Sequence, residues 1–126
     1  MTIDTMQPPA ESADSATLGC CGVVLAAPLP EADAIQLARG FAALADPVRL
    51  RLLSLIANTP DGEVCVCNLI EPVARSQPTV SHHLSILVKS GLIEREQRGK
   101  WAWYKVNAES VEMLRTALSG RLPITA

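Results

Sequence analysis

The amino-acid sequence predicts a mainly helical fold with one small β-hairpin, and three observations support this expectation. Apolar residues recur every three or four positions in several segments of helical length. Apolar and polar residues alternate on both sides of Arg98-Gly99-Lys100, as in two short strands joined by a turn. Turn-forming residues separate these segments. The expected order is four helices, two strands and a final helix, written ααααβ-βα.

Length and composition favour a single small domain. The chain has 126 residues, of which 48% are hydrophobic, so we expect one globular domain whose modest core gains from dimerisation. No apolar run reaches the roughly 18 residues of a membrane span, and the N-terminus lacks the Lys and Arg of a secretory signal. We therefore expect a cytoplasmic protein without a membrane partner. Its four cysteines are then better explained as thiolate ligands or redox groups than as disulfides.

The N-terminal region is expected to contain two segments before the folded domain. Residues 1–17 are rich in Pro, Ser, Ala and acidic residues and have little to bury, so we expect a disordered tail. Residues 18–30 form a segment that carries the adjacent pair Cys20 and Cys21. The folded domain is expected to span residues 31–120.

Two helices open the folded domain. Apolar residues at helical spacing predict a first helix over residues 31–45. Asp46 is placed to cap a second helix, which begins at Pro47 and runs to about Ala57. The turn residues of the stretch NTPDG then form a loop.

The next elements follow the pattern of a helix-turn-helix. Residues 63–73 are expected to begin extended and then to form a short helix, which leads through a tight turn into a long helix over 76–91. Ser76 can cap the long helix by accepting a hydrogen bond from the amide of Thr79, and Gly91 ends it. The stripe expected to face the core consists of Val80, Leu84, Leu87 and Val88.

The outward face of the long helix suggests contact with nucleic acid. Its side chains are small and polar with a single charge, whereas an ordinary solvated face carries Glu and Lys; Thr, Ser, His and Gln hydrogen-bond to base edges and phosphates. The net charge of −2 conceals a basic region. Residues 1–46 carry one arginine and six acids, whereas residues 75–105 carry six basic and two acidic residues. Local charge decides contact with phosphates.

The remaining elements are a hairpin and a final helix. Residues 92–97 and 101–106 are expected to pair around a basic tip, and a hairpin in this position is a wing. The aromatic residues of the hairpin are expected to pack within the fold rather than to stack on bases; they are Trp101, Trp103 and Tyr104. An amphipathic helix over 109–119 could pair with the first helix of a second subunit.

Four stretches together resemble the ArsR/SmtB family of winged-helix metal-sensing repressors. They are ALADPVRLRLLSLI, EVCVCNLIEPV, SQPTVSHHLSILVKSGLI and RGKWAWYKV, and the resemblance runs from about residue 34 to residue 118. The resemblance implies a winged helix-turn-helix protein that forms a homodimer through its first and last helices. It also implies that the dimer binds operator double-stranded DNA of two-fold symmetry.

The resemblance further implies which residues contact DNA. Matching motif positions are Gln77, Thr79, Ser81, His82, Arg98 and Lys100. Candidates for phosphate contact are Lys89, Arg75 and Arg95. His83 is expected instead to pack or to position the helix.

The stretch EVCVCNL resembles the ELCVCDL motif of arsenical and cadmium or lead sensors in this family, with Asn68 in place of Asp. Cys65 and Cys67 face the same side only in an extended segment, because helical residues two positions apart point about 200° apart. By resemblance to arsenic sensors of the actinobacterial type, Cys20, Cys21 and Cys65 bind As(III) or Sb(III) through three sulfurs, with Cys67 as a spare thiol. The alternative is a site for Cd(II), Pb(II) or Zn(II) that can use all four sulfurs.

Other functions are less well supported by the residues. The final helix has no His, so the interface zinc site of other family members is missing. A thiol enzyme would need C-x-x-C or a cysteine beside an activating group, and neither occurs. A repressor that senses redox state through a disulfide shares every feature except the ligand. We expect a repressor whose metal-free dimer occupies its operator and is released by the bound ion.

Overall fold

The computed structural model describes residues 24–119, and the chain divides into two compact units. Of the described residues, one unit comprises 38–111, and the other comprises 24–37 together with 112–119. The predicted tail over 1–17 and the pair Cys20 and Cys21 lie outside the described residues. Among the helices of the described part, none is long and apolar enough to cross a membrane.

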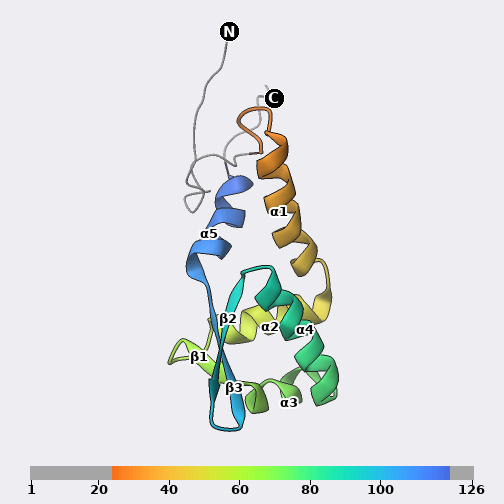
Figure 1. Ribbon diagram of the computed structural model, residues 1–126, viewed down its shortest axis with the longest axis vertical. Coiled ribbons are helices and arrows are strands. Elements are labelled where there is room, and N and C mark those ends of the chain that lie inside the picture. The colour runs from red at the N-terminus through yellow and green to blue at the C-terminus, as the bar shows by residue number, and fades with distance from the viewer. Residues whose placement is uncertain (1–23, 120–126) are drawn as a thin grey trace, which may run out of the picture. The chain divides into compact units, whose positions relative to one another are not determined.

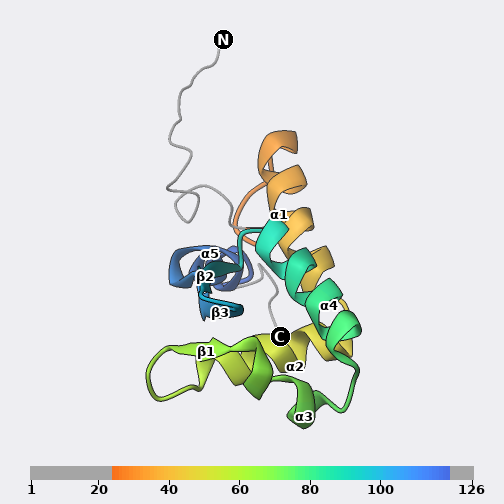
Figure 2. The ribbon, with the colours of Figure 1, turned by 60° about the horizontal axis from the view of Figure 1, so that its bottom comes forward.

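The predicted order of elements is confirmed, with helix boundaries within two residues of those expected (Figures 1 and 2). The helices and strands are α1 (Glu31–Leu44), α2 (Pro47–Ala57), β1 (Glu63–Cys65), the 3₁₀ helix η4 (Val66–Asn68), α3 (Ile70–Val73), α4 (Gln77–Lys89), β2 (Ile93–Arg98), β3 (Trp101–Val106) and α5 (Ala108–Ala117). Figure 2 shows α2, α3 and α4 following one another, with α3 next to the turn that leads into α4. This succession is the expected helix-turn-helix.

The sheet contains one more strand than the hairpin that the sequence predicts. Its order is β1-β3-β2 and all pairing is antiparallel. The extended start expected at Glu63 is therefore correct, but this strand also pairs with β3, so that Cys65 lies opposite Trp103. Local alternation cannot reveal such a partner, because the two strands are separated in sequence by the whole helix-turn-helix. In Figure 1, β1 lies along the hairpin.

The core of the 38–111 unit is built on the apolar stripe of α4. Val80, Leu84 and Leu87 have no exposed surface, as expected, whereas Val88 is only partly buried. The helix packs against α2 and β2, and the other core side chains include Leu52, Ile56, Val64, Leu69, Val73, Leu92, Ile93 and Tyr104. The expectation of aromatic packing holds for Tyr104, but Trp101 is 44% exposed because it lies beside the hairpin tip.

Local caps fix the ends of α2 and α4. The Asp46 carboxylate accepts hydrogen bonds from the amides of Val48 and Arg49 at 2.8 and 3.2 Å. Desolvation would raise the pKa of Asp46, but these amide hydrogen bonds lower it overall. Ser76 accepts from the amide of Thr79 at 3.4 Å, as predicted.

Gly91 ends α4 in a Schellman motif. Its amide donates to the carbonyl of Val88 at 3.0 Å, and the amide of Leu92 donates to the carbonyl of Leu87 at 3.1 Å. The motif requires a left-handed residue, and Gly91 has φ +85°. A Cβ at this position would meet only the Ser110 hydroxyl at 3.8 Å, which is an ordinary contact distance. Glycine is therefore needed for its backbone conformation and not for space.

The substitution Gly91→Ala should lower the free energy of unfolding by about 1–2 kcal/mol, because an alanine must adopt the left-handed conformation. Gly91→Asn should cost less, since Asn tolerates this region better. Urea denaturation followed by circular dichroism measures both. If alanine were as stable as glycine, the helix end would have to adopt another conformation in solution.

Candidate nucleic-acid interface

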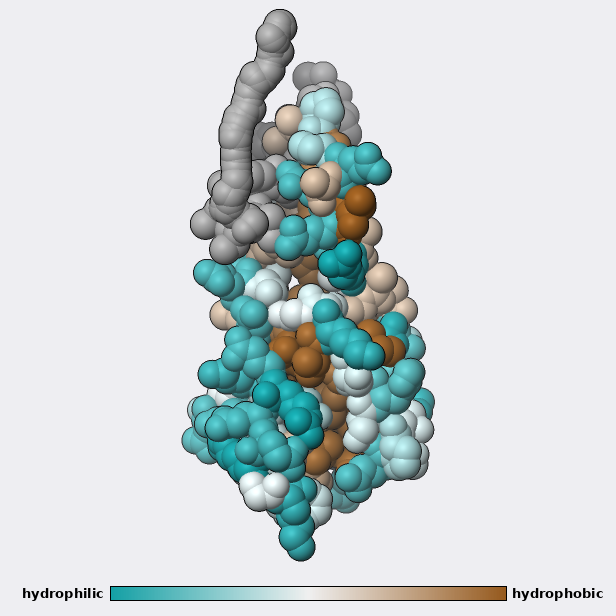
Figure 3. All heavy atoms as spheres, in the orientation of Figure 1, coloured by the Kyte–Doolittle hydropathy of each residue, from teal (hydrophilic) through white to brown (hydrophobic). Residues whose placement is uncertain are grey.

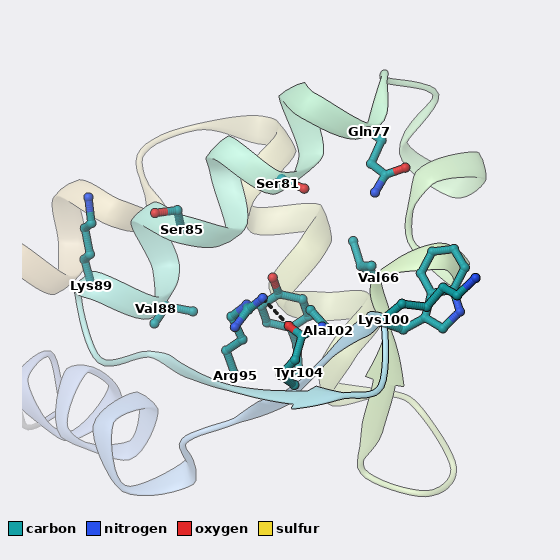
Figure 4. Close-up of a pocket in the computed structure, with 12 residues that line it drawn as sticks. Val66, Gln77, Ser81, Ser85, Val88, Lys89, Arg95, Lys100, Ala102 and Tyr104 are labelled. Carbon is teal, nitrogen blue, oxygen red and sulfur yellow. Dashed lines mark hydrogen bonds between the residues drawn. The ribbon is translucent and has the colours of Figure 1, made fainter.

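A groove of about 390 Å³ separates α4 from the inner face of the hairpin (Figure 4). One stripe of α4 borders it at intervals of four residues: Gln77, Ser81, Ser85 and Lys89. From the sheet, Arg95, Gln97 and Lys100 complete the polar border. Figure 3 shows an apolar strip between the hydrophilic sides of the hairpin and α4, and the apolar lining of the groove consists of Val66, Val88, Trp101, Ala102 and Tyr104.

The groove is electropositive. Its lining includes Lys89, Arg95 and Lys100 but no carboxylate. Arg95 donates to the Gln97 side-chain oxygen at 2.6 Å, and the Gln97 amide group donates to the carbonyl of Gly99 at 3.0 Å. These two bonds hold a cation and an amide on the groove face of β2. A channel with fixed cations and hydroxyls along its border is suited to a phosphate backbone.

The other predicted residues of α4 lie on the same helix but not on the groove. Thr79 and His82 are exposed, and neither lines the groove. The Thr79 hydroxyl accepts from the Ser76 hydroxyl at 3.0 Å, so this side chain also belongs to the helix cap. His83 is partly buried and its Nδ1 lies 3.2 Å from an Arg49 nitrogen, as expected for a packing or positioning role.

Arg98 lies on the opposite face of the sheet from Arg95. Its guanidinium pairs with Glu63 and, at 2.8 Å, with Glu96, and its central carbon lies 4.8 Å from the centroid of the Trp103 ring. The hydrogen bond from Arg98 lowers the pKa of Glu96. Lys100 has no ion-pair partner within residues 24–119 and remains exposed at the tip. The two predicted wing cations thus differ, since only Lys100 is both unpaired and on the groove.

Strand parity was the available signal for the groove residues of the wing. Alternate residues of a strand point to opposite faces, so Arg95 and Gln97 share one face while Glu96 and Arg98 share the other. Motif position alone does not show which face of the strand a residue is on. Gln97 lines the groove but is therefore not among the DNA contacts predicted from the sequence.

The two described cysteines lie where β1 turns into η4. Cys65 is 4% exposed, and its sulfur accepts a hydrogen bond from the amide of Cys67 at 3.3 Å, so it caps the 3₁₀ helix. Cys67 is exposed. The neighbouring Cys65 thiol raises the pKa of the Cys67 thiol most, and desolvation raises it further. The extended segment stops at Cys65, and the hydrogen bond from the Cys67 amide to the Cys65 sulfur links the two residues.

The described residues include only two of the four cysteines of the predicted sulfur site. Among residues 24–119, no cluster of three or more Cys, His, Asp or Glu side chains is placed to hold a metal ion. Cys65 and Cys67 are the two described candidates, and the other two predicted ligands, Cys20 and Cys21, lie outside the described residues.

The sequence matches a family of known regulators. The model described as "Bacterial regulatory protein, arsR family" matches residues 46–95. The arsenical resistance operon repressor of Bacillus subtilis is 39% identical over 74 residues, which are 59% of this chain and 69% of that repressor. Across the curated relatives compared, the chain spans between 56% and 79% of the relative's length.

Solved structures agree with this similarity. The AntR antimony-specific transcriptional repressor aligns with a TM-score of 0.60 at 27% identity, covering 71% of this chain and 79% of that one. A homodimeric winged helix-turn-helix DNA-binding domain from Mycobacterium bovis, described as a possible ArsR-family regulator, aligns with a TM-score of 0.57 at 27% identity. That alignment covers 71% of this chain and 83% of the domain.

The groove predicts an order of importance among the wing cations. Arg95→Ala and Lys100→Ala should each reduce the slope of log affinity against log salt concentration by about 1, as expected for the loss of one phosphate contact. Arg98→Ala should change the slope less, because Glu63 and Glu96 already neutralise this cation. Fluorescence anisotropy with a labelled random-sequence duplex at several salt concentrations measures all three. A larger effect for Arg98→Ala would mean that this side chain leaves its carboxylate partners when DNA binds.

Proposed function

Because the chain belongs to the ArsR family of DNA-binding transcriptional regulators, which are not enzymes, we propose that it is a metalloid-responsive repressor. Its homodimer binds operator DNA of two-fold symmetry in the cytoplasm and is released when As(III) or Sb(III) binds to cysteine thiolates. The names of two similar proteins support the inducer class, since one is an arsenical resistance operon repressor and the other is antimony-specific.

The observation that carries the proposal is the position of Cys65 in the sheet of the wing. This residue ends β1, and β1 is hydrogen-bonded to β3, which is half of the hairpin. The cysteine is followed directly by η4 and α3, which lead into α4. An ion that displaced Cys65 would move the wing through the hydrogen bonds between β1 and β3. It would move α4 through η4 and α3. Both DNA-contacting elements are therefore connected to one thiol.

The chemistry of the ion favours three sulfurs. Soft ions prefer thiolates, and As(OH)₃ can exchange its three hydroxyls for three thiolates with release of three water molecules. We assign Cys20, Cys21 and Cys65 as these ligands, with Cys67 as a spare thiol. The protons of the three thiols leave with the hydroxyls as water, and binding must open the site around Cys65, which is buried.

The proposed response is a change in the geometry of the dimer. Tying the N-terminal segment to the start of η4 would shift the two α4 helices out of register with the operator half-sites. Coupling is reciprocal, so DNA must weaken ion binding by the same factor as the ion weakens DNA binding. A coupling free energy of about 3 kcal/mol corresponds to roughly a hundredfold change in affinity, which is enough to release an operator.

Two alternatives use the same cysteines. Cd(II) or Pb(II) would use four sulfurs, and the hydrogen bond that joins the Cys67 amide to the Cys65 sulfur at 3.3 Å is the observation that favours this version. A redox-sensing repressor would respond to oxidation of the same pair. The three versions differ in their ligand and in the role of Cys67.

Cys65→Ser should leave operator affinity within about twofold and abolish release by arsenite, because a serine hydroxyl does not replace a thiolate ligand. Anisotropy on a duplex selected from random DNA by the wild-type protein measures both quantities, under reducing conditions and with arsenite, Cd(II) or peroxide added separately. Cys67→Ser is the matched control and should still respond to arsenite. Release of the Cys65→Ser protein by arsenite would refute the site.

The same titrations separate the alternatives. Release of the wild-type protein by Cd(II) or Pb(II), with arsenite weak and with loss of response in Cys67→Ser, would support the four-sulfur site. Release by peroxide alone would support redox sensing and exclude the ion.

A further inference from the structure

Arg49 joins three helices of the 38–111 unit through one guanidinium. It belongs to the first turn of α2, and its Nε donates to the carbonyl of Ala43 at 2.6 Å, in the last turn of α1. A terminal nitrogen donates to the carbonyl of Ala42 at 3.4 Å. The other terminal nitrogen lies 3.2 Å from Nδ1 of His83 in α4. No other side chain in the described residues hydrogen-bonds to both α1 and α4.

Apart from the Asp46 carboxylate at its cap, α2 itself offers nothing that favours a cation at Arg49. The amino-terminal turn of a helix has a positive dipole end, which disfavours a positive charge, and no acidic residue lies in the first turn of α2. The carboxyl end of α1 is the favourable partner, because its last carbonyls lack helical donors and its last turn has no basic residue. Arg49 thus supplies the cation that the last turn of α1 lacks.

The contact with Arg49 determines the role of Nδ1 in the His83 ring. A guanidinium is always charged and can only donate, so Nδ1 of His83 must accept. The neutral ring then carries its proton on Nε2. A charged imidazole would place two donors against each other at 3.2 Å. His83 is partly buried and precedes the core residue Leu84, so its ring is well placed to set the rotation of α4.

We propose that Arg49 and His83 are positioning residues for DNA recognition, which lock the reading helix α4 to the carboxyl end of α1 through an acceptor at Nδ1. Neither residue needs to touch DNA. Arg49 and the half-buried ring behind the helix set the angle at which Gln77 and Ser81 meet base edges. The inference depends on DNA binding and is independent of which ion, if any, releases the operator.

The test compares two amides at position 83. An asparagine oxygen occupies roughly the place of Nδ1, whereas a glutamine oxygen reaches the place of Nε2. His83→Asn should keep the affinity for the selected duplex within about twofold, and His83→Gln should lower it about tenfold, comparable to the loss of one base contact. Asparagine is the poorer helix former, so helix propensity alone predicts the opposite order.

Arg49→Lys gives an independent reading, since a lysine cannot reach three acceptors with a planar fork. It should lower affinity for the selected duplex about tenfold while leaving both the salt dependence and the affinity for unselected DNA unchanged. Thermal unfolding and sedimentation of each variant check folding and dimer formation. If Arg49→Lys does not fold, the comparison of His83→Asn with His83→Gln still tests the proposal.

Two outcomes would overturn the inference. Equal behaviour of His83→Asn and His83→Gln, whether both bind normally or both bind weakly, would show that an acceptor at Nδ1 is not required. A salt slope reduced by about 1 in the Arg49 variant would show that Arg49 is itself a phosphate contact.

Discussion

The structure depends on one constraint, which is that α4 must bury one side completely and leave the other side free. Val80, Leu84 and Leu87 have no exposed surface, and the packing of this stripe against α2 and β2 holds the helix in place. Deleting one such side chain typically costs 2–5 kcal/mol, a large part of the stability of a small domain. The polar face is thereby left for recognition. Its Gln77, Ser81, Ser85 and Lys89 stand along the groove at a spacing that only a rigid helix maintains.

The third strand gives the sheet a second role. A hairpin of β2 and β3 alone would form the wing without any connection to Cys65. Because β1 joins β3, the sheet also contains Cys65, and Glu63 of the same strand pairs with Arg98 of the wing. The strand therefore contributes both a backbone ladder and an ion pair to the connection between the thiol and the hairpin. A surface ion pair of this kind contributes little to stability. Its main effect is to hold Arg98 on the face of the sheet opposite the groove.

Features that depend on neighbours in sequence were predictable, and features that depend on distant partners were not. The helix ends at Asp46, Ser76 and Gly91 follow from caps and glycine, and the structure has them as expected. The pairing of β1, the burial of Cys65 and the contact of Arg49 with His83 bring together residues far apart in the chain. The position of Arg98 could have been predicted from strand parity, but only with the pairing partner Glu63 known. The placement of Cys20 and Cys21 remains an expectation.

The register of the sheet has a spectroscopic consequence. The chain has two tryptophans, and one of them, Trp103, lies directly opposite Cys65 with the Arg98 guanidinium over its ring. Trp101 is the more exposed of the two. Indole emission responds to nearby charge, polarity and heavy atoms. An ion bound at Cys65 would therefore change the emission of Trp103. Binding at this thiol can therefore be followed by the emission of the unlabelled chain, with Trp101→Phe isolating the signal of Trp103.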